Sequence, residues 1–215
     1  YKGQALEPGM LEGYALQAVA HGADLLSFFR WRTAITGAEM FCNGLKDHDN
    51  AWNKNLDELQ HLTSARLSKM PDISETTIQS KVAMLYAADQ EFSFNMQAQS
   101  KGFTYWTQLR LFHDVCMNLG VNLDIIPEGT SLSQYSVVIV PTQFIVNHKV
   151  VASLEEFVKN GGIAIITNRS GVKDENGNCI FGESLPTKFR RLCGCHIIET
   201  DAIGEAQYRI RSIHG

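Results

Sequence analysis

Long hydrophobic runs and clusters of positive charge are both missing from this sequence. No uninterrupted apolar stretch approaches the roughly 20 residues that a membrane-spanning helix needs, so we expect no membrane partner. The formal net charge is -4 and the Lys and Arg residues form no run. Nucleic-acid binding requires clustered basic side chains that neutralise phosphates. We therefore expect no nucleic-acid partner either.

The motifs that hold nucleotides and metals are also absent. The sequence contains no G-x-G-x-x-G fingerprint, no P-loop and no His-Glu-x-x-His pair. The cysteines number five, and their one cluster is Cys193-Gly194-Cys195-His196. A structural zinc site normally takes four ligands from two spaced pairs, and no second pair is present. We expect reduced thiols, no metal, no cofactor and a reducing compartment, the cytoplasm.

The sequence divides into two halves of different character. Residues 71–79 are polar, include Pro71 and show no helical period, which is typical of a linker. We predict one domain fragment over 1–70 and a separate domain over 80–215. The chain opens with Tyr1 rather than Met and without a signal-peptide pattern, and we expect it to start partway along a longer gene product or to follow processing.

The first half predicts one strand between two helices. Pro8 marks the start of a helix that ends at His21. The apolar run 25–31 predicts a buried strand, and a second helix is expected over about 50–68, with His48-Asp49 as its cap. One strand and two helices cannot form a domain alone. This half therefore has the pattern of the end of a larger barrel.

The second half alternates short apolar strands with amphipathic helices, which is typical of a parallel α/β sheet. Strands are expected at 81–86, 121–127, 136–141, 163–167 and 196–199. Helices are expected at 105–119, 147–159 and 188–193, a hairpin turn at 174–178, and a long loop at 89–101. Together they predict a flavodoxin-like open sheet.

The strand ends of that sheet invite a catalytic interpretation. Amidotransferases of this sheet type need a Cys nucleophile on a sharp turn after a strand, and the corresponding turn here is Asn168-Arg169-Ser170. Ser170 is a possible nucleophile, although no G-x-S-x-G surrounds it. A scaffold or interface domain is the favoured interpretation. A non-catalytic ligand- or partner-binding module and a hydrolase that uses Ser170 are the alternatives.

Glu39 is the most suggestive residue of the first half. It lies in the loop after the aromatic segment that contains Phe28, Phe29 and Trp31. In a barrel, loops of this kind open on the catalytic face. Sugar-binding sites pair aromatic rings, which contact the apolar face of a pyranose, with carboxylates that bind its hydroxyls. A surface glutamate near core aromatics is an equally good interpretation of these residue types.

The order of these residues resembles glycoside hydrolase family 42. The first half is similar to the C-terminal end of that family's catalytic (β/α)8 barrel in its segments 17–24 (QAVAHGAD), 29–32 (FRWR), 37–41 (GAEMF) and 47–49 (DHD). The second half is similar to the family's trimerisation domain, which has a class I glutamine amidotransferase-like fold without amidotransferase chemistry, in 135–141 (YSVVIVP), 154–162 (LEEFVKNGG) and 167–175 (TNRSGVKDE).

This resemblance implies a retaining exo-β-galactosidase that hydrolyses terminal β-D-galactosyl residues with two glutamates. Those glutamates belong to earlier barrel strands, so it implies no catalytic residue in this chain, and the segment alone is expected to be inactive. Phe29 would line the galactose subsite and Glu39 would bind a sugar hydroxyl. Cys42 stands where the family often has His, and a thiol is a weaker donor. The implied partners are a galactoside substrate and, as a homo-oligomer, two further copies in a trimer.

Overall fold

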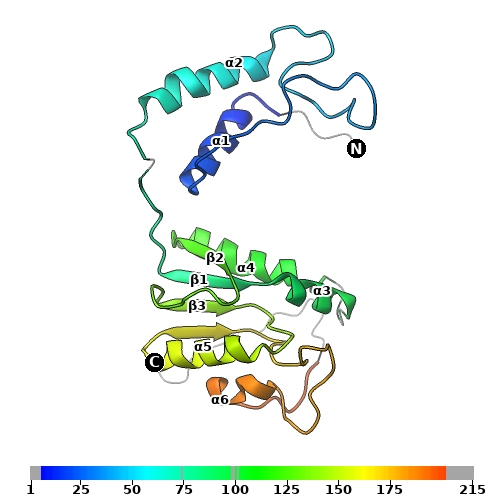
Figure 1. The fold of residues 1–215 in the computed structure, drawn as a ribbon, viewed down its shortest axis with the longest axis vertical. Helices are drawn as coiled ribbons and strands as arrows, with labels where there is room; N and C mark the ends of the chain where they lie inside the picture. Colours follow the sequence, from blue (N-terminus) through cyan, green and yellow to red (C-terminus); the bar gives the residue numbers. More distant parts are fainter. Residues whose placement is uncertain (1–5, 74, 98–99, 101, 202–215) are drawn as a thin grey trace. The chain divides into compact units, whose positions relative to one another are not determined.

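The chain folds into two compact units, Tyr1–Ile78 and Gln79–Gly215, shown in Figure 1. The computed structural model describes residues 6–73, 75–97, 100 and 102–201. Helices and strands bury their apolar residues separately within each unit. Each unit is therefore described by itself.

The second unit is built on a four-stranded parallel sheet of order β2-β1-β3-β4. The strands are β1 Val82–Tyr86, β2 Leu123–Pro127, β3 Val137–Val140 and β4 Ile163–Ile166. Each of the four lies within a run that the apolar pattern predicts as a strand. The order is that of a flavodoxin-like sheet, so the predicted fold of this half is confirmed.

Side chains of the central strands alternate between two buried layers, as the two-residue period of a strand requires. Ala83 and Leu85 of β1 pack with α5, His148–Lys159, in one core cluster. Met84 packs with α3, Ala88–Met96, and α4, Tyr105–Asn118, in the other. The helices α3 and α4 cover one face of the sheet and α5 covers the other (Figure 1). Burial on both faces explains why the strands are continuous apolar runs.

The segment expected to be a long loop at 89–101 instead forms α3 over Ala88–Met96. Its large apolar residues Phe92, Phe94 and Met96 follow a two-residue period, which hides a helix from pattern analysis. Phe94 alone among these three is buried, in edge contact with the rings of Phe103 and Phe144. Gln90 and Ser93 are buried as well, so the helix buries a face that is mostly polar.

The chain after β4 confirms two expectations and corrects one. The turn at 174–178 is a hairpin, in which Lys173 pairs antiparallel with Cys179. The short helix is present as a 3-10 turn, Thr187–Phe189, followed by α6, Arg190–Cys193. The strand expected at 196–199 is wrong: this segment makes no ladder, and the backbone hydrogen bond recorded for it joins the N–H of Ile197 to the carbonyl oxygen of Leu185, at 2.7 Å.

The first unit contains two helices, α1 Met10–Ala20 and α2 Lys54–His61. The second helix continues as a π-helix, Leu62–Arg66, and a 3-10 turn, Leu67–Lys69. It begins at Lys54 rather than near residue 50 because the Asn53 side chain accepts hydrogen bonds from two N–H groups of its first turn. His48 is not the cap: its Nε2 lies 2.9 Å from the carbonyl oxygen of Ala34.

Carboxylates join the two helices of the first unit. Glu58 of α2 accepts hydrogen bonds from the N–H groups of Gly9, at 2.8 Å, and Glu12, at 3.5 Å, at the amino end of α1. An anion is favourable at that end of a helix. In return, the Glu12 carboxylate contacts His61 Nδ1 at 2.7 Å and Arg66 Nε at 2.6 Å. These two side chains lower the pKa of Glu12 below its ordinary value of 4.5.

The strand expected at 25–31 is wrong for the chain as described. Residues 25–31 form no ladder, and the local pairing is an isolated parallel bridge between Arg32 and Lys46. A strand needs neighbours on at least one side, and none of the described residues of this unit forms a strand next to this segment. In both units, every helix of the described part of the chain is too short or too polar to span a lipid bilayer.

Candidate functional site

The first unit contains a cavity of about 810 Å³. Its apolar wall includes the rings of Phe28, Phe29 and Phe41, and its polar wall includes Asn43, Asp47, Lys54, Asn55 and Cys42. The volume lies in the range of small-molecule sites, which are mostly apolar with a few polar groups. Two of the three sugar-binding residues expected from the sequence, Phe29 and Cys42, therefore line one cavity.

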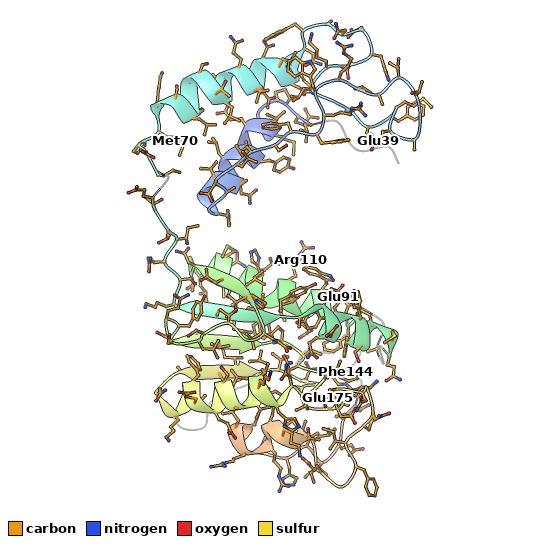
Figure 2. All side chains as sticks on the ribbon, in the orientation of Figure 1. Glu39, Met70, Glu91, Arg110, Phe144 and Glu175 are labelled. Atoms are coloured by element: carbon orange, nitrogen blue, oxygen red, sulfur yellow. The ribbon has the colours of Figure 1, made fainter. Side chains whose placement is uncertain are left out.

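Glu39 does not line that cavity, but it is connected to it. Figure 2 shows Glu39 on the long loop between α1 and α2. Its carboxylate forms an ion pair with Arg30, Nη1 to Oε2 at 2.9 Å, and its backbone carbonyl accepts the N–H of Cys42 at 3.0 Å. One turn of chain thus separates the carboxylate from the cavity wall.

Arg30 is the residue that the sequence analysis missed. Its guanidinium carbon lies 5.7 Å from the centre of the Phe29 ring, close enough for a cation–π contact. The same guanidinium holds the Glu39 carboxylate. The signal in the sequence was an arginine next to an aromatic residue and nine positions before an acid. Ring, cation and carboxylate therefore form one continuous contact series.

The aromatic side chains of this region are unusually exposed. Phe29 is 72% exposed and Phe41 is 76% exposed, and Leu25, Ile35 and Trp52 are exposed as well. Phe29 and Phe41 also line the cavity, and exposed aromatic rings beside a cavity are typical of sites that contact a ligand or another surface. The surface around the cavity thus has the properties of a binding or packing face.

The strand ends of the second unit do not form a catalytic centre around Ser170. Ser170 is 2% exposed, and its hydroxyl oxygen accepts the backbone N–H of Gln143 at 3.0 Å. The glycine that follows, Gly171, has a φ of +72°, and a Cβ there would lie 2.5 Å from the carbonyl oxygen of Pro186. Burial and tight backbone packing give this loop a structural role and argue against the serine-hydrolase alternative.

Phe144 lies at the same end of the sheet, beyond β3 (Figure 2). It is fully buried, and the cationic groups of Arg169 and Lys173 lie 5.5 Å and 5.3 Å from the centre of its ring. Cation–π contacts of this kind stabilise partly desolvated charges. The loop 168–174 therefore contacts the core through the cation–π contacts of its own basic residues with Phe144.

The cysteine cluster at the end of the described chain does not gather a metal-ligand set. Burial raises the pKa of the Cys193 thiol, and the neighbouring Cys195 raises it further. A raised pKa keeps the thiol protonated and disfavours metal binding and nucleophilic attack. Within residues 6–73, 75–97, 100 and 102–201, no group of three or more His, Cys, Asp or Glu side chains is placed to hold a metal ion.

Comparison with known families matches almost all of the chain. Residues 2–69 match the glycoside hydrolase family 42 model described as β-galactosidase. Residues 80–213 match the model described as the β-galactosidase trimerisation domain. The two matches fall on either side of the boundary between the two structural units.

Individual relatives give the same result. The chain is 39% identical over 209 residues to the β-galactosidase BgaA of Clostridium cellulovorans, covering 97% of this chain and 32% of that protein. It is 31% identical to the β-galactosidase Pbg of Clostridium perfringens, covering 91% of this chain and 29% of that protein. The chain thus spans about 30% of the length of these curated relatives.

Solved structures share the fold. The β-galactosidase of Bacillus circulans sp. alkalophilus superposes with a TM-score of 0.85 at 26% identity, over 93% of this chain and 30% of that one. Gan42B, a family 42 β-galactosidase from G. stearothermophilus, superposes with a TM-score of 0.83 at 28% identity, over 95% of this chain and 30% of that one. These matches define the class: a segment of a glycoside hydrolase, in which the end of a catalytic barrel precedes an α/β domain. The chain belongs to glycoside hydrolase family 42.

Proposed function

We propose that the chain is a segment of a retaining exo-β-galactosidase that acts on terminal β-D-galactosyl residues. On this proposal the first unit contributes one side of the galactose subsite and the second unit contributes to assembly. The observation that carries the proposal is the contact series in the first unit, from the exposed Phe29 ring through Arg30 to the Glu39 carboxylate, beside a cavity of about 810 Å³.

Each residue of this series suits one part of a pyranose. The Phe29 ring offers an apolar face to the C–H groups of the sugar. Glu39 accepts hydrogen bonds from sugar hydroxyls, and charged acceptors make the stronger bonds. Arg30 positions the carboxylate, because its Nη1 lies 2.9 Å from Oε2. Binding and orientation are thus the tasks of this segment.

The bond-breaking step needs two carboxylates, one that protonates the glycosidic oxygen and one that forms the covalent glycosyl intermediate. The proposal assigns both to barrel strands outside this segment and none to this chain. Cys42 lines the cavity as a weak hydrogen-bond donor. We expect it to contribute shape rather than a strong polar contact.

The exposed apolar side chains of the first unit support this proposal. Leu25, Ile35 and Trp52 would be costly to leave in water. The rest of a barrel, on the proposal, supplies the strands that flank residues 25–31 and covers these side chains. The match of residues 80–213 to a trimerisation domain supports a homotrimer as the assembly.

The full-length enzyme provides the test of the sugar site. Glu39→Gln and Phe29→Ala are each expected to lower kcat/KM for a chromogenic β-galactoside by about 10- to 100-fold. A hydrogen bond to a charged group contributes about 1.5–3 kcal/mol, which applies to Glu39. Full burial of a phenylalanine side chain contributes a similar amount, about 1.5–3 kcal/mol, which applies to Phe29. Glu7→Gln, an exposed acid of the same unit, is the matched control and should leave kcat/KM unchanged. Unchanged kinetics in both site variants would refute the subsite.

The isolated segment provides a second test. Purified residues 1–215, freed of host enzyme, are expected to show no turnover of the same chromogenic galactoside, because the proposal places both catalytic carboxylates elsewhere. Measurable hydrolysis that follows the segment through purification would overturn that assignment. Light scattering of the full-length enzyme tests the trimer, and a monomer at working concentration would contradict it.

A further inference from the structure

The carboxyl ends of β1, β2 and β3 meet at the place where doubly wound sheets bind ligands. In the order β2-β1-β3-β4, the chain moves from β1 to one side of the sheet and then to the other. The crevice between β1 and β3 is therefore the switch point of the topology. Ligands of such folds bind in that crevice, outside the carboxyl ends of the strands.

A side chain of the chain itself occupies this position. Glu128, the first residue after β2, receives three amide groups. Its Oε1 accepts hydrogen bonds from Gln90 Nε2 at 3.1 Å and from Gln143 Nε2 at 2.6 Å. Its Oε2 accepts one from Asn147 Nδ2 at 3.0 Å. Residues that follow β1 and β3 thus converge on a carboxylate that follows β2.

The amide groups are held in place independently of Glu128. Gln90 is 2% exposed and bonds to Ile145 in both directions: its Oε1 accepts the backbone N–H at 2.8 Å and its Nε2 donates to the carbonyl oxygen at 3.0 Å. Gln143 is also 2% exposed, and its Nε2 lies 3.3 Å from the same carbonyl. The donors would therefore keep their positions if the carboxylate were removed.

The third donor places the carboxylate near a helix end. Asn147 is the N-cap of α5, and its Oδ1 accepts the backbone N–H of Lys149 at 3.0 Å. That bond fixes its Nδ2 toward Glu128. The amino end of a helix favours negative charge, so the cap adds an electrostatic preference to three directed hydrogen bonds.

We propose that Gln90, Gln143 and Asn147 form a carboxylate-binding site that Glu128 fills from within the chain, and that the site takes a small free carboxylate when the Glu128 side chain is removed. The donors are neutral amides arranged on two oxygens, which suits a planar monoanion such as formate or acetate. Thr142, directly before Gln143, is fully buried, and its hydroxyl has no hydrogen-bond partner among the described residues. This hydroxyl is a further polar group at the same edge of the sheet. This inference is independent of the galactosidase proposal.

The experiment uses Glu128→Ala in the full 1–215 chain. The melting midpoint of the second unit should fall by about 5 °C, because buried amides lose a charged acceptor. Sodium acetate or formate should restore at least half of the loss in a saturable manner. Sodium chloride at the same concentration should not. Wild-type protein and Glu156→Ala, which removes an exposed acid from α5, should respond alike to acetate and chloride.

Two further variants separate the outcomes. Gln143→Leu added to Glu128→Ala should abolish the recovery by acetate, because it removes one donor. Glu128→Gln replaces the charged acceptor with a neutral amide that still fills the site. We expect it to melt lower than wild type and to gain no stability from acetate. Because its side chain leaves no gap, we also expect it to fold even if the alanine variant does not. Recovery that survives Gln143→Leu, an equal response in wild type, or recovery of the glutamine variant by acetate would each overturn the proposal, as would an unchanged midpoint in Glu128→Ala.

Discussion

The two units of this chain bury apolar surface to very different extents. In the second unit, both faces of the sheet are covered, and buried residues such as Val138, Leu154 and Phe189 form two core clusters together with partly buried neighbours. In the first unit, the buried cluster consists of Leu11, Leu45 and Leu56. The second unit thus has the core of an independent domain, whereas the first has a core too small for one.

The difference follows from what each unit does with its aromatic residues. The second unit encloses Phe94, Tyr105 and Phe144, which stabilises the sheet. The first unit presents Phe29 and Phe41 to the outside. Exposed aromatic rings stabilise a structure only when another surface or a ligand covers them.

Leu154→Ala should give the largest stability effect and sharpen this comparison. Leu154 is fully buried in α5, and truncating such a residue costs about 2–5 kcal/mol. The second unit has one tryptophan, Trp106, while Trp31 and Trp52 belong to the first. Urea unfolding in a Trp31→Phe, Trp52→Phe background therefore reports on the second unit.

Val158→Ala on the same helix is the control, since Val158 is exposed, and its effect should be below about 0.5 kcal/mol. In a Trp106→Phe background, the first unit should unfold at the same urea concentration with and without Leu154→Ala. A shift of both transitions together would mean that the two units unfold as one.

Alkaline pH should destabilise the second unit selectively. Burial, the main cause, raises the pKa of Tyr105 to about 12. A raised folded pKa means that this contribution to stability is complete below pH 10 and is lost as the pH rises from 10 toward 12. The Trp106 transition should shift to lower urea over that window, and Tyr105→Phe should reduce the shift. Equal pH dependence in both proteins would contradict this role of the phenol.

Acidic pH should destabilise the first unit by a smaller amount. The pKa of Glu12 is lowered by hydrogen bonds from His61 and then Arg66, so its contribution is complete above 4.5 and is lost as the pH falls through the lower folded value. The transition of Trp31 and Trp52 should move to lower urea below pH 4.5. In Glu12→Gln this movement should be weaker. An unchanged acid dependence in that variant would show that the contact contributes little.

Arg110→Ala should have the smallest effect. The Arg110 side chain (Figure 2) pairs with Asp114 at 3.6 Å, one helical turn further along α4, and both are well exposed. Exposed pairs of this spacing contribute about 0.3–0.5 kcal/mol, and less at high salt. The Trp106 transition should change by no more than that amount. A loss above about 1 kcal/mol would indicate that this helix face has a further contact.

The sheet was predictable because its strands are buried on both faces and flanked by clear helix signals. The run 82–86 needs no tertiary information to be recognised as a strand. The helix α3 could not be predicted, since its apolar residues alternate and two of the three residues on its buried face, Gln90 and Ser93, are polar. The absent strand at 25–31 has the opposite cause: its residues favour a strand, but pairing partners are a property of the surrounding fold.

The candidate sugar site was predictable in part. Phe29, Glu39 and Cys42 follow from the order of motifs, and their assignment to a sugar stays a prediction. The contacts of Arg30 with both Phe29 and Glu39 could not be predicted, because no sequence pattern specifies which acid an arginine will pair with. The amide cluster around Glu128 could not be predicted either, because its members come from three separate segments, which follow β1, β2 and β3, and only the sheet order brings them together.

The π-helix after α2 changes the direction in which the side chains that follow it point around the helix axis. In a regular α-helix, His61 and Arg66 would point about 140° apart, because successive residues turn by about 100°. The wider turn over Leu62–Arg66 brings both side chains round to the two oxygens of Glu12. One additional residue in the turn therefore keeps on one face two side chains that a regular α-helix would separate. Deleting any one of Thr63, Ser64 or Ala65 should let this segment return to a regular α-helix, with the arginine four positions after His61, the spacing that keeps it beside Glu12.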